Sequence, residues 1–126
     1  MRFLVMVKSN EEAESGAVPP PELFEEMGKF NDQLVKAGVL LDAAGLRPSS
    51  EGVRITYSGS QRSVTDGPFA EAKELVAGFW IWQLRSQDEA IEWAKRIPFQ
   101  GGEGVDIRRI SEAEDFADAP NEAAAR

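Results

Sequence analysis

The residues from 75 to 84 form the most apolar stretch of the chain and constrain its fold more than any other segment. The stretch is rich in aromatic and β-branched side chains, which favours a strand over a helix. Along a strand, Trp80 and Trp82 would point to one face, and Phe79 and Ile81 would point to the other. We expect this strand to be a central strand of the sheet. The strand predicted at 3–7 also has two apolar faces and should be covered on both.

Two amphipathic helices are predicted, one on each side of this strand in the chain. The first should begin near the prolines at 19–21, which a first helical turn tolerates, and end at Gly38. The second should begin at a capping box made by Ser86 and Glu89 and end at Pro98. Further strands are predicted at 3–7, 39–46, 53–57, 62–65 and 105–110, the third and fourth of these being joined as a hairpin.

This order of elements predicts an α+β fold, a ferredoxin-like antiparallel sheet with two helices on one face. The other face of the sheet would be open and would carry either the two tryptophans or Phe79 and Ile81. An exposed apolar patch of this kind usually marks a binding or dimer surface, so we expect a homodimer packed sheet on sheet. Trp80 and Trp82 could also form aromatic walls for a planar ligand, but dimer core is the favoured interpretation.

Chain length and charge set the domain boundaries. The 126 residues suffice for one domain, which we place at residues 1–111. Residues 112–126 are expected to be a flexible acidic tail, in which only Phe116 is a candidate for docking on the body. The net charge of −8 argues against nucleic acid and anionic membranes as partners. The first apolar run is too short for a secretory signal, so a cytoplasmic location is expected.

The chain contains neither cysteine nor histidine. These absences exclude disulfides, thiol nucleophiles, histidine general bases and ordinary zinc sites. The glycine-rich segment at 101–104 lacks the Lys-Ser/Thr of a phosphate loop, and no fingerprint of a cofactor is present. We therefore expect no cofactor and no metal site, and only carboxylates, lysines, arginines, hydroxyls and Tyr57 remain for chemistry.

A ten-residue string, TDGPFAEAKE at 65–74, is followed at 78–80 by Gly-Phe-Trp. It resembles the signature of the YCII-related (DGPF-domain) family, and further matches fall in order over roughly residues 1–111. The resemblance implies a dimeric α/β-barrel built from ferredoxin-like halves, with a cleft beside the sheet. In some relatives it also implies a His-Asp catalytic pair, and in others a location beside sigma-factor-like transcription proteins. Relatives often have a histidine in the first helix, where this chain has Met27 or Asn31, which counts against a histidine-dependent activity.

Asp66 has two interpretations. As a turn residue, it would bond its own following amides, with Gly67 supplying an unusual dihedral angle. As a carboxylate in a cleft, it would act as a general base or hold a cationic ligand. Turn chemistry alone explains the residue types of the string, so we favour the structural interpretation. Candidate ligand-binding residues are Arg47, Lys73, Glu74, Asn31 and Trp80, although an exposed charge or a weak surface pair is the simpler account of the charged ones.

Three functions remain open from the sequence. The favoured one is a dimeric module that binds a small ligand or has an accessory role. The second is a cofactor-free lyase or isomerase that acts on a small aromatic or hydroxylated acid with Asp66 as its base. The third is an interaction partner of a sigma-factor-like transcription regulator.

Overall fold

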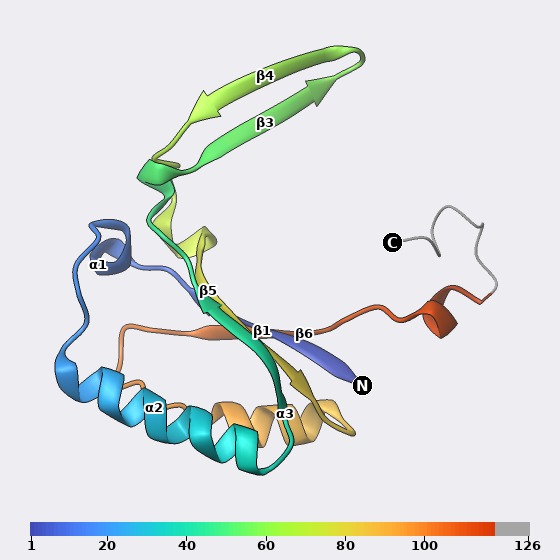
Figure 1. The fold of residues 1–126 in the computed structure, drawn as a ribbon. Helices are drawn as coiled ribbons and strands as arrows, with labels where there is room; N and C mark the ends of the chain where they lie inside the picture. The colour runs from blue at the N-terminus through green and yellow to red at the C-terminus, as the bar shows by residue number, and fades with distance from the viewer. Residues whose placement is uncertain (118–126) are drawn as a thin grey trace.

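A four-stranded antiparallel sheet, in the order β2-β5-β1-β6, forms the body of the molecule (Figure 1). The structure, a computed structural model, describes residues 1–117, of which Lys73 is described by its backbone alone. The predicted apolar strand lies at an inner position of the sheet, as its composition requires. The four strands are β1 (Arg2–Lys8), β2 (Leu40–Gly45), β5 (Val76–Gln83) and β6 (Val105–Arg109).

Both predicted helices are present and lie on one face of this sheet (Figure 1). The first, α2 (Pro21–Lys36), begins at the prolines and ends before Gly38, whose φ of 72° only glycine adopts readily. The second, α3 (Gln87–Ala94), has Ser86 as its N-cap and ends before Pro98 is reached. A further short helix, α1 (Glu11–Glu14), is capped by Asn10 inside the segment before α2.

The core lies between the sheet and the two helices. Trp80 and Trp82 face the helices, and Phe30 of α2 packs edge-on against them with ring centroids 5.9 and 6.2 Å away. Removing each of these rings from water stabilises the body by about 1.5–3 kcal/mol. The buried core residues are Phe3, Val5, Phe30, Leu34, Val39, Trp80, Trp82, Leu84, Ala90 and Ile97.

The opposite face of the sheet carries Phe79 and Ile81, because side chains alternate along a strand. The register places Met6 opposite Phe79 and Leu4 opposite Ile81, and all four side chains are half-buried. We call these four residues the open face. The favoured interpretation of the tryptophans as dimer core is therefore wrong, since Phe30 from the same chain covers them.

The predicted hairpin is present but does not join the four-stranded sheet. Strands β3 (Val53–Ser58) and β4 (Gln61–Asp66) pair only with each other in a separate two-stranded sheet, which we call the arm. It is connected to the body through the short turns η1 (Ser49–Glu51) and η2 (Ala72–Glu74). The fold is thus a mixed α+β arrangement of antiparallel sheets with three α-helices, and residues 1–117 form no closed barrel.

The predicted acidic tail is anchored at its start. Glu112 pairs with Arg2 at 2.8 Å, and Asp115 pairs with Arg109 at 2.8 Å, just before and within the turn η3 (Ala113–Phe116). Phe116 is half-buried. The predicted flexibility of the rest of the tail stays a prediction, because positions 118–126 lie outside the described residues.

Candidate functional site

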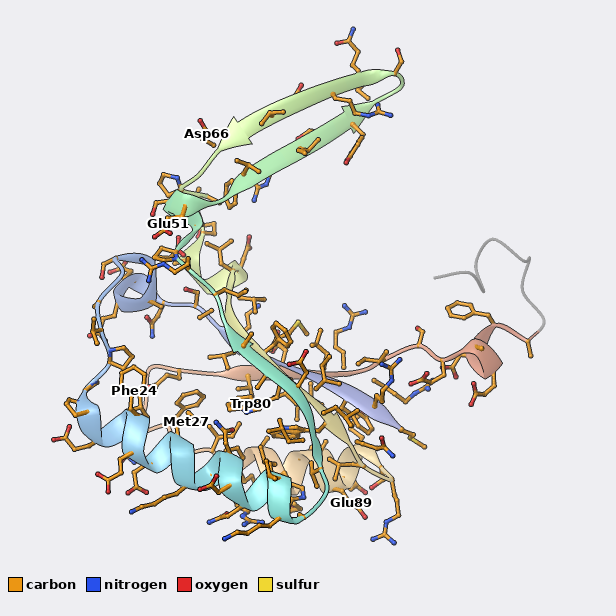
Figure 2. All side chains as sticks on the ribbon, viewed as in Figure 1. Phe24, Met27, Glu51, Asp66, Trp80 and Glu89 are labelled. Carbon is orange, nitrogen blue, oxygen red and sulfur yellow. The ribbon has the colours of Figure 1, made fainter. Side chains whose placement is uncertain are left out.

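A cavity of about 460 Å³ opens between the N-terminal half of α2 and the sheet. We call it the α2 cleft. Leu23, Phe24 and Met27 form its helix wall, and Trp80 and Phe99 lie on its other sides. Figure 2 shows Phe24, Met27 and Trp80 around the space between α2 and the sheet. Its size is in the range of small-molecule sites.

The α2 cleft exists because small residues of the sheet lie opposite the first half of α2. Ala43, Gly45 and Gly78 line the cleft opposite the first half of α2, whereas the second half of the helix packs on Trp80 and Trp82. At Gly78 even a Cβ atom would come within 2.9 Å of the Ala44 carbonyl oxygen, so a larger side chain does not fit there. Helix and sheet therefore close at one end and remain apart at the other.

One oriented polar group lies in the otherwise apolar α2 cleft. The Nε1–H of Trp80 donates a hydrogen bond of 2.8 Å to Oδ1 of Asn31. This bond fixes the side-chain amide of Asn31, so that its Nδ2 is the group free to donate, and no residue in the described part of the chain accepts from it. A bound molecule with an acceptor atom would therefore be held in one orientation.

A second hollow of about 390 Å³ continues from the α2 cleft toward α1. The two cavities share Val7, Pro19, Leu23 and Phe99 among their lining residues. We call the second hollow the outer groove. Unlike the α2 cleft, it is lined by charged side chains of both signs, namely Lys8, Glu12, Arg47 and Glu103.

Arg47 lies in the outer groove but already has a carboxylate partner. Its guanidinium binds Glu51 through two nitrogens, at 2.8 and 3.1 Å, and both side chains are exposed. These hydrogen bonds lower the pKa of Glu51 below its ordinary value, against a smaller opposing effect of desolvation. A ligand carboxylate could bind Arg47 only in competition with Glu51.

The signature string builds the root of the arm. A Cβ atom on Gly67 would lie 1.7 Å from the carbonyl oxygen of Ser49, so only glycine fits there. The backbone N–H of Phe69 donates to Oγ of Ser49 at 3.0 Å. Ser49 in turn donates to the carboxylate of Glu14 from its backbone N–H, at 3.0 Å, and from its hydroxyl. The ring of Phe69 lies 4.1 Å below the guanidinium of Arg54. The string thus fixes where the arm leaves the body.

The predicted site residues divide into two groups. Asn31 and Trp80 meet in the α2 cleft, with Arg47 in the adjoining groove. Asp66 is exposed at the end of β4, apart from the cleft (Figure 2), and neither it nor Glu74 lines either cavity. The side chain of Lys73 lies outside the described residues.

Sequence reasoning did not identify Phe24, Phe99 and the small residues of β2 and β5 as a site. The sequence did contain an indication of this cavity. The apolar stripe of the helix, Leu23, Met27, Phe30 and Leu34, is longer than the part of the apolar strand that carries large side chains. Opposite its first half, the strands contribute Ala-Ala-Gly at 43–45 and Ala-Gly at 77–78. Such a mismatch in side-chain volume indicates a cavity.

Within residues 1–117, no group of three or more acidic side chains is placed to hold a metal ion. In the same part of the chain, every helix is too short or too polar to cross a membrane.

Comparison with known proteins gives a family match and one curated relative. The model of the YCII-related domain matches residues 1–114. An uncharacterized protein of Rhizobium meliloti (strain 1021) is 32% identical over 75 residues, which are 60% of this chain and 60% of that protein. The chain thus matches three fifths of the length of this relative, whose name assigns no activity.

Proposed function

Because the chain belongs to the YCII-related family, we propose that it is a homodimeric module that binds a small molecule in the α2 cleft. The observation that carries this proposal is the cavity of about 460 Å³ with a single oriented amide, that of Asn31. Binding sites for small molecules are typically apolar hollows with a few fixed polar groups, and the α2 cleft has this composition.

The lining of the two cavities limits the chemistry of the ligand. No ionisable side chain lines the α2 cleft, so the inserted part of the ligand is a ring or a short chain without charge. An oxygen or nitrogen acceptor on this part would receive the N–H of Asn31. In the outer groove, an anionic end of the ligand would bind Arg47 in competition with Glu51 and Lys8 in competition with Asp106. A small amphipathic molecule with an aromatic or aliphatic head fits both regions.

The open face supports the homodimer. Both α2 and α3 lie on one side of the sheet (Figure 1). The register and the alternation of side chains place Leu4, Met6, Phe79 and Ile81 on the other side. A second copy stacked on this face would bury the four side chains in both protomers. Two ferredoxin-like bodies joined in this way would form the dimeric α/β-barrel that the family resemblance implies.

The position of Asp66 supports binding over catalysis by this carboxylate. A general base has to reach the reacting atom through a hydrogen bond, and Asp66 lies on the arm rather than in the α2 cleft. A lyase or isomerase with Asp66 as its base would need a substrate site at the arm root.

The test is a thermal-shift screen with small phenols, aromatic acids and short fatty acids, repeated on two tryptophan variants. Met27→Trp fills the α2 cleft and should abolish the stabilisation by any compound that raises the Tm of the wild type, because the ligand loses its space. Val35→Trp places the same side chain on the exposed side of α2 and should leave binding unchanged. A compound that stabilises the wild type and Met27→Trp equally would contradict the proposal.

A further inference from the structure

The two faces of the arm differ in polarity. The register Val53↔Asp66, Ile55↔Val64 and Tyr57↔Arg62 places four apolar side chains on one face, together with Arg62 and Asp66 at its two ends. All four are exposed: Val53 60%, Ile55 47%, Tyr57 67% and Val64 68%. The other face is polar and carries Arg54, Thr56, Ser58, Ser63 and Thr65. An alternating pattern of this kind is typical of a strand pair with one face against another surface.

No such surface for the arm is present within residues 1–117. Every residue of β3 and β4 is exposed, and the two strands pair only with each other. A lone two-stranded hairpin is at best marginally stable in water. The root contacts at Ser49, Gly67 and Phe69 fix its direction but leave its apolar face uncovered.

The direction of the arm indicates what covers it. The arm leaves the body on the side of the sheet opposite to α2 and α3, which is the side of the open face (Figure 1). In the described part of the chain, two apolar surfaces on this side are therefore uncovered, the open face and the apolar face of the arm. A single partner that stacks on the open face is in a position to meet both.

Charge favours a second copy as this partner. The arm, residues 53–66, has two arginines and one aspartate and therefore a net charge of +1. The rest of the chain carries −9, since the whole chain carries −8. The arm and the rest of the chain thus differ in the sign of their net charge, which favours the approach of the arm to another copy.

We propose that the arm packs its apolar face on the body of a second copy, so that the two protomers of the dimer exchange arms around a two-fold axis. This inference rests on the proposed homodimer and adds a second contact region to the stacked sheets. In a two-fold dimer each contact occurs twice, so the eight apolar side chains of two arms would be covered.

The direct test places a lysine on each face of the arm. Ile55→Lys puts a charge into the proposed contact and should raise the dimer dissociation constant at least tenfold in sedimentation velocity. Thr56→Lys, the next residue on the polar face, is the matched control and should leave the constant within twofold. Near-ultraviolet circular dichroism of the core tryptophans, which are distant from the arm, verifies that both variants fold.

The absence of cysteine in the chain allows a second measurement on single-cysteine variants. In the dimer, the thiol of Val64→Cys should react with a thiol reagent at least tenfold more slowly than that of Ser63→Cys on the opposite face. Dilution to monomer should make the two rates equal. Equal rates in a dimer, or an unchanged dimer in Ile55→Lys, would overturn the arm contact and leave the stacked sheets standing. A monomeric wild type would overturn both.

Discussion

Strands of the body and of the arm both carry exposed or buried rows of apolar side chains, yet those facing α2 are packed and those of the arm are bare. In β5 the side chains of Trp80 and Trp82 are at most 5% exposed, because Phe30 and Leu34 of α2 lie against them. In β3 the side chains of Ile55 and Tyr57 have no helix to contact and stay exposed. An apolar face of a strand thus needs cover, whereas the rest of the fold decides whether the same chain supplies it.

The largest expected difference between the two regions concerns their share in stability. Trp82→Ala removes a fully buried ring and should lower the free energy of unfolding by about 3–5 kcal/mol, a large part of the stability of a domain of this size. Val64→Ala on the arm should change it by less than about 0.5 kcal/mol in dilute solution, where the monomer dominates. Urea unfolding followed by circular dichroism measures the free energy of unfolding of both variants. Similar losses in the two variants would contradict this difference between body and arm.

A smaller effect is expected at the root that joins the two regions. Gly67→Ala forces a Cβ atom against the carbonyl oxygen of Ser49 and should cost about 1–3 kcal/mol. Because the clash is local, hydrogen exchange should accelerate at Gly67 and Phe69, whose amides bond Gly52 and Ser49, and not in β1 or β5.

Gly104→Ala is the matched control for this prediction, because no atom lies within 4 Å of the added Cβ. Exchange should then match the wild type at the arm root. Loss of protection throughout β5 in Gly67→Ala would mean that the arm and the body unfold as one unit.

The smallest effect concerns the surface ion pair beside the arm root. Hydrogen bonds from Arg47 lower the pKa of Glu51 in the folded chain. The pair therefore stabilises the fold at pH values above the ordinary pKa of a glutamate. The contribution is lost as the pH falls through the lowered value. Arg47→Gln should raise the pKa of Glu51 in a titration followed by NMR, while Asp115, held low by Arg109, should not change. An unchanged Glu51 titration would show that the pair does not persist in solution.

Most elements of the body could be predicted from the sequence because their signals are local. The prolines before α2, Gly38 after it, and the Ser86 cap of α3 each act through backbone groups a few residues away. The direction of the tryptophans was not predicted, because both faces of β5 are apolar and only the position of Phe30 selects between them. The separation of the arm from the sheet was not predicted either, and the close approach of Gly67 to Ser49 at its root is a contact between residues distant in the chain.

The candidate site was predicted less completely than the fold. Asn31 and Trp80 were identified, but the sequence does not show that their hydrogen bond lies at the end of a cavity. Asp66 was a candidate because it belongs to the signature string. The glycine and the phenylalanine of this string are explained by the packing of the arm root. A motif made of turn residues is compatible with both a structural and a catalytic role until the surrounding contacts are known.

The central claim is that a second copy covers the surfaces that this chain leaves bare. The mass of the wild-type protein in solution, measured by light scattering at micromolar concentration, tests this claim most directly. We predict twice the chain mass of 13.8 kDa. A mass of 13.8 kDa over the whole concentration range would contradict the account.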